Sequence, residues 1–78
     1  MIRKSKFKKG DKVVFIEQHT DSSGFVVKKG KVGTVSEKYW DVWRQTWAYD
    51  IDNIPIKRGV SSLHSVAFGV TEDSLKRR

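Results

Sequence analysis

The chain has 78 residues, and 16 Lys and Arg against 9 Asp and Glu give it a formal net charge of +7. This length allows one domain with one core, and the lack of cysteine excludes disulfides and cysteine-ligated zinc. No apolar run approaches the ~20 residues of a membrane span, and no apolar stretch of a secretory signal follows the basic N-terminus. We therefore expect a cytoplasmic protein without membrane contact and, from its charge, a polyanionic partner, most often nucleic acid.

The first nine residues form a basic segment without any acid, in which Ile2 and Phe7 are the apolar anchors. This pattern predicts a flexible basic arm over residues 1–9, with Phe7 docking near the domain. A single domain then covers residues 10–78.

Turn signals and β-branched residues organise the next part of the chain. Gly10-Asp11 predicts a turn, and Lys12–Glu17 is rich in Val, Ile and Phe, which favours a strand. The polar residues of His19–Gly24 predict a loop, and Phe25–Val27 resumes extended structure.

Two longer strands are predicted after this loop. Lys31–Tyr39 is the first, and Gly33 within it marks a bulge, a sharp bend or the close approach of another backbone. Gln45–Asp52 alternates with period two, which is typical of a half-buried strand. We assign its inward face to Trp47, Tyr49 and Ile51.

The segment between these strands, WDVWRQTW, permits two interpretations. Trp40, Trp43 and Trp47 have the spacing of one helix face. The flanking strand patterns and the β-propensity of Val, Thr and Trp instead favour a hairpin with its tip near Trp40–Arg44.

The C-terminal part predicts one more strand and a short turn. Asn53–Gly59 contains the single proline and predicts a loop, and Val60–Gly69 predicts a strand. The tail predicts one helical turn capped by Thr71, with Leu75 pointing inward. About five short strands at this spacing favour an all-β barrel, because closure removes exposed sheet edges.

Two segments, FKKGDKVVFI and KKGKVGTVSE, carry a family resemblance. Together they resemble the KOW pattern, in which a GD-x-V strand leads through a loop to G-x-x-G-x-V, and the ending GVTEDSLKR is similar to the closing turn and strand of SH3-like barrels. The resemblance implies a small five-stranded SH3-like (KOW- or Tudor-like) barrel and a tendency to bind nucleic acid or its machinery. The matching residues are Gly10, Asp11, Val13, Gly30, Gly33 and Val35.

Catalysis is not expected from this sequence. His19 and His64 have no neighbouring acid or cysteine that suggests a triad or a metal site, and the Asp50/Asp52 pair fits a solvated strand face. We therefore expect no enzyme activity, no metal and no cofactor.

Clustered cations and two tryptophans are the candidate binding residues. In a small barrel a turn and both termini can converge, which would offer a positive track to phosphates. Trp40 or Trp43 could be exposed and stack on a base, or both could close the barrel end as a lid. The predicted nucleic-acid-binding residues are Arg3, Lys4, Lys6, Lys8, Lys9, Lys28, Lys29, Lys31, Lys38, Trp40, Trp43, Arg44, Lys57 and Arg58.

Three functions remain open at this stage. The first is a nucleic-acid-binding module, with DNA favoured slightly over RNA because no RNA-specific aromatic pair is present. The second is a protein-interaction module with an aromatic groove around Tyr39, Trp40 and Trp43, such as a small phage-type regulatory factor or an adaptor on a polymerase or ribosome. The third is the subunit of an oligomeric enzyme, and the oligomeric state is open. Evenly spread lysines that serve only solubility are the alternative to any binding role.

Overall fold

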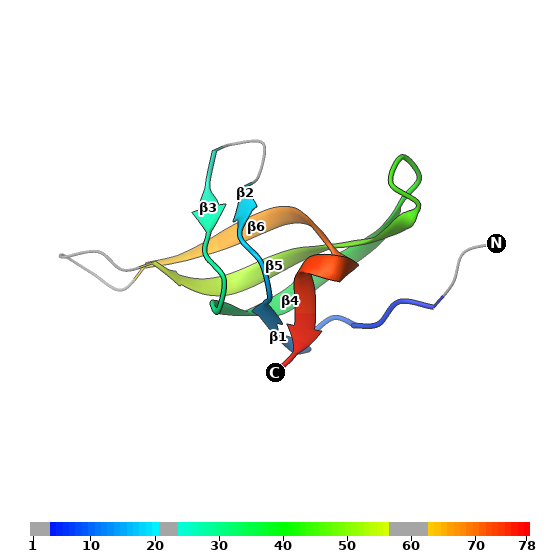
Figure 1. Ribbon diagram of the computed structural model, residues 1–78. Helices are drawn as coiled ribbons and strands as arrows, with labels where there is room; N and C mark the ends of the chain where they lie inside the picture. The colour runs from blue at the N-terminus through cyan, green and yellow to red at the C-terminus, as the bar shows by residue number, and fades with distance from the viewer. Residues whose placement is uncertain (1–3, 21–23, 57–62) are drawn as a thin grey trace.

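The computed structural model describes residues 4–20, 24–56 and 63–78, and these residues form strands and one short 3₁₀ turn. The all-β prediction is confirmed, and the described part of the chain holds no helix able to cross a membrane. Figure 1 shows the strands in chain order. They are β1 (Lys12–Phe15), β2 (His19–Thr20), β3 (Val26–Val27), β4 (Val32–Asp41), β5 (Thr46–Ile56), β6 (Leu63–Thr71) and β7 (Leu75–Arg77), with the 3₁₀ turn η1 (Glu72–Ser74) before β7.

Five strands form one antiparallel sheet in the order β6-β5-β4-β1-β7, and β2 and β3 form a second, two-stranded sheet (Figure 1). The predicted number of sheet strands is therefore confirmed, but the predicted barrel is not closed. Strands β6 and β7 are the two edges, and no ladder joins them within the described residues. The barrel stays open because β7 has three residues, which pair with β1, and because η1 separates β7 from β6.

The alternation of apolar residues places one sheet face inward. In β1 the side chains of Val13 and Phe15 are buried, and Lys12 points to solvent. In β5 both Tyr49 and Ile51 are buried, as predicted. These side chains pack with the remaining core residues, which are Phe7, Val27, Val35, Ile54, Ala67, Val70 and Leu75.

Gly33 allows β4 to lie close to β5. It pairs with Val13 in β1, and a Cβ at this position would come within 2.9 Å of the Asp52 carbonyl oxygen and would collide with Ile51. Close backbone approach is therefore the role of this glycine. The irregularity of the ladder lies two residues later, between Val35 and Glu37.

Three segments differ from the sequence prediction, and the first is Leu75–Arg77, which was expected within a helical turn but forms β7. Asn53–Ile56 was expected in a loop but continues β5, because Asn53 adopts a positive φ of 56° and the ladder to β6 resumes at Ile54. His19 and Thr20 were also expected in a loop, but they pair with β3. The rest of the predicted 53–59 loop lies outside the described residues.

The tryptophan-rich segment is a hairpin, as the propensity argument favoured. Trp40 in β4 faces Trp47 in β5 across the ladder, and Val42–Gln45 forms the turn between these strands. Figure 1 shows this hairpin projecting beyond the rest of the sheet. At the C-terminal end the predicted short turn is η1, and Leu75 after it is buried.

Candidate functional site

A basic groove of about 560 Å³ lies between the N-terminal segment and the β4–β5 hairpin. Of the eight described residues that line it, five are cationic and none is acidic. The N-terminal segment, β4 and β7 each contribute cations, so residues far apart in sequence meet here. The lining residues are Lys4, Ser5, Lys6, Phe7, Lys8, Lys38, Trp47 and Arg77.

Buried contacts hold the N-terminal segment against the sheet. Phe7 is buried and packs edge-on against the ring of Tyr49, with 5.4 Å between the ring centroids. The backbone N–H of Lys6 donates to Glu72 Oε2 at 2.8 Å, and Arg77 Nη2 donates to the Lys6 carbonyl at 2.9 Å. Docking of Phe7 is therefore as predicted. Lys4–Lys9 lies along the domain, and residues 1–3 of the predicted arm lie outside the described residues.

Lys38 joins the N-terminal segment to the aromatic side chains of the hairpin. Its Nζ donates to Ser5 Oγ at 3.0 Å and lies 5.4 Å from the centroid of the Trp47 ring. An ammonium group at this distance from an indole is attracted by the ring quadrupole. Trp47 was assigned to the core, but it is only partly buried and packs against the core while also lining the basic groove.

The charges around the basic groove are partly balanced at its edges. Arg77 Nη2 lies 3.4 Å from Asp11 Oδ2, and Lys9 Nζ lies 3.5 Å from Glu37 Oε2. Both pairs involve exposed cations, so solvent and salt screen them strongly. The groove itself therefore keeps a positive surface that a phosphate can approach.

The hairpin tip presents Trp43 to solvent, with 93% of its surface exposed. Asp41 Oδ1 accepts hydrogen bonds from the backbone N–H groups of Trp43 at 3.0 Å and of Arg44 at 3.2 Å. The Asp41 side chain therefore closes the turn as an Asx motif. Trp40 is only partly exposed, and its ring packs edge-on against Trp47 with centroids 5.8 Å apart.

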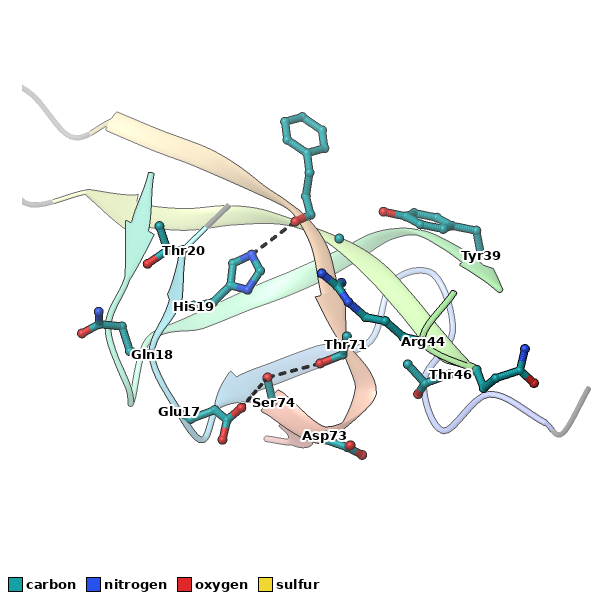
Figure 2. A pocket seen from close by; sticks show the side chains of 13 residues that line it. Glu17, Gln18, His19, Thr20, Tyr39, Arg44, Thr46, Thr71, Asp73 and Ser74 are labelled. Carbon is teal, nitrogen blue, oxygen red and sulfur yellow. Dashed lines mark hydrogen bonds between the residues drawn. The ribbon is translucent and has the colours of Figure 1, made fainter. Parts of the chain in front are cut away.

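A second groove, the aromatic groove, lies on the other side of the sheet and has a volume of about 800 Å³. Consecutive strand residues point to opposite faces, and Lys38 lines the basic groove while Tyr39 lines the aromatic one. Its exposed rings are Tyr39 and Phe68, at 41% and 57% exposure. Figure 2 shows His19 and Arg44 reaching it from separate segments.

Hydrogen bonds fix the walls of the aromatic groove. His19 Nε2 lies 3.2 Å from the Phe68 carbonyl oxygen (Figure 2), and because a carbonyl only accepts, this ring nitrogen carries a hydrogen. Tyr39 Oη donates to Asp50 Oδ1 at 3.2 Å. Partial burial, together with the Asp50 carboxylate, raises the pKa of the Tyr39 phenol above its usual value. This phenol therefore stays a hydrogen-bond donor at neutral pH.

The predicted site residues divide into several groups. Lys4, Lys6, Lys8 and Lys38 meet in the basic groove, whereas Arg44 lines the aromatic groove. Trp43 is exposed at the hairpin tip and is not a lining residue of either groove. Neither groove is lined by Lys9, Lys28, Lys29, Lys31 or Trp40, and Arg3, Lys57 and Arg58 lie outside the described residues.

Four members of the basic groove were not among the predicted site residues, namely Ser5, Phe7, Trp47 and Arg77. Arg77 belongs to the basic tail Lys76–Arg78, and pairing of β7 with β1 brings it next to the N-terminal segment. Trp47 was missed because its alternation with Tyr49 indicates a core position. Its position near the start of the predicted strand could have indicated partial exposure, since residues at strand ends are often not covered by the core.

The described residues contain no group of three or more His, Cys, Asp or Glu that could hold a metal ion. Comparisons with protein-family models, with curated proteins and with solved structures returned no match.

Proposed function

We propose that this protein is a non-enzymatic nucleic-acid-binding module that grips the phosphate backbone in its basic groove. The convergence of Lys4, Lys6, Lys8, Lys38 and Arg77 around Trp47 carries the proposal. Each phosphate that these cations neutralise releases condensed counterions, which favours binding. A groove with a few such contacts fits weak, sequence-tolerant binding, with a Kd of roughly 10⁻⁴ to 10⁻⁶ M at physiological salt.

The finer fold assignment is part of this proposal. We assign the chain to the KOW-like group of SH3-like domains, as an open variant. Gly10 and Gly30 of the pattern adopt φ values of 93° and 95° in the turns before β1 and β4, and Val13 and Val35 are buried. The turn η1 followed by β7 matches the closing turn and strand of the resemblance. These features support the assignment, which in turn supports a nucleic-acid partner.

DNA is favoured over RNA as the natural ligand, because the sequence contains no motif that resembles an RNA-specific signature such as the RNP aromatic pair. The test is a titration of fluorescein-labelled DNA at several salt concentrations, followed by fluorescence anisotropy. We expect the logarithm of the association constant to fall linearly with the logarithm of salt, with about 0.7–0.9 units of slope per phosphate contact. A protein that binds no DNA or RNA even at about 50 mM salt would contradict the proposed function.

The aromatic groove supports a second candidate function, a protein-interaction module. This groove has two exposed rings, Tyr39 and Phe68, and the carboxylates of Glu17 and Asp73 also line it. Aromatic grooves of this kind hold extended peptides. The test is a pull-down from nuclease-treated extract with the protein and its Phe68→Ser variant. A partner that the parent protein retains and the Phe68→Ser variant loses would favour the protein-interaction function. A partner that nuclease treatment releases would favour nucleic-acid binding.

A further inference from the structure

One face of the β4–β5 hairpin carries aromatic rings that continue from the basic groove. Lys38 Nζ lies 5.4 Å from the Trp47 ring, and the Trp47 ring lies 5.8 Å from the Trp40 ring. Trp40 and Trp47 are cross-strand partners near the end of the ladder, one pair before the last, Asp41 with Thr46. The positive groove therefore leads along an indole-lined surface to the tip of the hairpin.

The tip itself is built to hold Trp43 in place without covering it. Asp41 Oδ1 accepts from the N–H groups of Trp43 and Arg44, and Gln45 Nε2 donates to the Val42 carbonyl at 2.7 Å. Gln45 adopts a positive φ of 55°, which the side-chain hydrogen bonds of the turn help to maintain. The backbone of the turn is fixed in this way, while the indole keeps 93% exposure. Such preorganisation lowers the entropy lost when an aromatic side chain meets a ligand.

A phosphate-only contact would not need these rings. Phosphates are neutralised by lysine and arginine, whereas an indole contributes through stacking on a base that has a free face. In a duplex the faces of the bases are occupied by their neighbours, and opening a step for a side chain costs a few kcal/mol. An unpaired strand offers those faces without this cost.

We propose that the preferred ligand is nucleic acid with unpaired bases, and that Trp43 stacks on one of those bases while the basic groove holds the backbone. This inference rests on the proposed function and adds the class of nucleic acid. The continuity of the indole surface with the basic groove favours this occupant over a protein, since Lys38 contacts both Trp47 and the N-terminal segment. The phosphates are held near Lys38, and the strand then runs along the hairpin toward Trp43.

The test compares three DNA ligands of equal length, about 12 nucleotides, which lies within the usual range of single-strand site sizes. They are a single strand, the same strand with abasic sites in place of its bases, and the duplex. The abasic strand keeps the phosphates and removes the stacking. We expect the single strand to bind about 5- to 150-fold more tightly than the abasic strand, which corresponds to one stacked base.

Three variants complete the experiment. Trp43→Ala should reduce the ratio of single-strand affinity to abasic-strand affinity to about 1 and leave the affinity for the abasic strand unchanged. Trp43→Phe should keep a large part of this ratio. Phe68→Ala removes an exposed ring from the aromatic groove and should leave the ratio unchanged. Since Trp43 is exposed at a turn, these variants should fold like the parent protein.

The outcomes separate the inference from the proposed function. Equal affinity for the single strand and the abasic strand would overturn the inference and leave phosphate binding intact. Tighter binding of the duplex, or a Trp43→Ala variant that keeps the full ratio, would also overturn it. If none of the three ligands binds at about 50 mM salt, the proposed function fails together with the inference.

Discussion

The phenol of Tyr49 donates a hydrogen bond of 2.7 Å to Glu72 Oε2, and both side chains are buried. Glu72 lies in η1 with only 1% exposure. The same carboxylate oxygen accepts the backbone N–H of Lys6, so one buried acid connects β5, the last turn and the N-terminal segment. A buried carboxylate is tolerated only when it is well hydrogen-bonded, and this network supplies such bonds.

The first prediction concerns the loss of this carboxylate. Glu72→Ala leaves the Tyr49 hydroxyl and the Lys6 N–H without this acceptor, and each unsatisfied buried donor costs about 1–3 kcal/mol. We expect the free energy of unfolding to fall by about 2–4 kcal/mol, as measured by urea denaturation. Glu72→Gln is the matched control because it keeps the shape and one acceptor oxygen. A loss for Ala no larger than that for Gln would contradict the proposed role of this hydrogen-bond network.

The second prediction concerns alkaline pH. Burial, with the hydrogen bond to Glu72 as the next cause, raises the pKa of Tyr49 to about 12. The folded state therefore favours the protonated phenol, so its stabilisation is complete below the unfolded pKa of about 10 and is lost as pH rises toward 12. The shift corresponds to about 2–3 kcal/mol. Tyr49→Phe removes this ionisation, and its unfolding free energy should fall less steeply over the same range.

Ultraviolet absorbance of tyrosinate gives an independent check of the second prediction. Tyr49 in the folded protein should ionise well above the usual pH, and Tyr49→Phe should lose that late step. The pKa of Tyr39 is also raised, so the difference between the two proteins isolates Tyr49. If the Tyr49 phenol ionised near pH 10 in the folded protein, the buried hydrogen bond to Glu72 would be contradicted.

The third prediction concerns the close approach at Gly33. An added Cβ would come within 2.9 Å of the Asp52 carbonyl oxygen and 3.1 Å of Ile54 Cγ1, and both are parts of the paired sheet. Gly33→Ala should therefore lower the free energy of unfolding by about 2–3 kcal/mol, the upper part of the ~1–3 kcal/mol range for overpacked sites. Thr34→Ala on the same strand is the control, with an expected change below about 1 kcal/mol. Equal losses in the two variants would show that β4 can move away from β5.

Strands β1, β4, β5 and β6 could be predicted from local pattern because their residues have β-propensity and apolar residues at alternate positions, whereas β2 and β7 were not predicted. Val13 and Phe15, for example, are buried on one face of β1, as the KVVF sequence indicates. Tyr49 and Ile51 follow the same rule in β5. For Gly33 the sequence left three roles open, a bulge, a sharp bend or close backbone approach, and the structure selects the last.

Other features depend on long-range pairing that no local pattern encodes. The pairing of β7 with β1 brings Arg77 next to Lys6, which are 71 residues apart in sequence. The continuation of β5 through Asn53 requires a positive φ at this residue. Asparagine adopts positive φ mostly in turns, so the sequence favoured a loop here. Trp47 alternates with the core residues but lies near the end of β5, where the sheet no longer covers it completely. The open edges of the sheet follow from strand lengths, which are the least certain part of a sequence prediction.

The fourth prediction concerns the charge of the basic groove. Lys38→Gln removes one cation from the groove and keeps a hydrogen-bond donor for Ser5. We expect the slope of the logarithm of DNA affinity against the logarithm of salt to decrease by about 0.7–0.9, which corresponds to one phosphate contact. The measurement is anisotropy at four or five salt concentrations.

The matched control for the fourth prediction is Lys12→Gln. Lys12 is exposed on β1, donates to Thr34 Oγ1 at 3.2 Å and lines neither groove, but its replacement changes the net charge equally. Its salt slope should stay close to that of the parent protein. If both variants lose the same slope, binding follows net charge alone and the groove has no special role.

The last prediction concerns the turn that presents Trp43. Asp41→Ala removes the acceptor that fixes the N–H groups of Trp43 and Arg44, so the turn must be ordered when a base binds. Ordering one side chain and its turn costs about 0.5–1.5 kcal/mol, so single-stranded DNA should bind about 2- to 10-fold more weakly. Asp41→Asn keeps the acceptor and removes the same negative charge, so comparing the two variants cancels the electrostatic effect. Equal affinity of the Ala and Asn variants for single strands would mean that the preorganised turn does not contribute to stacking.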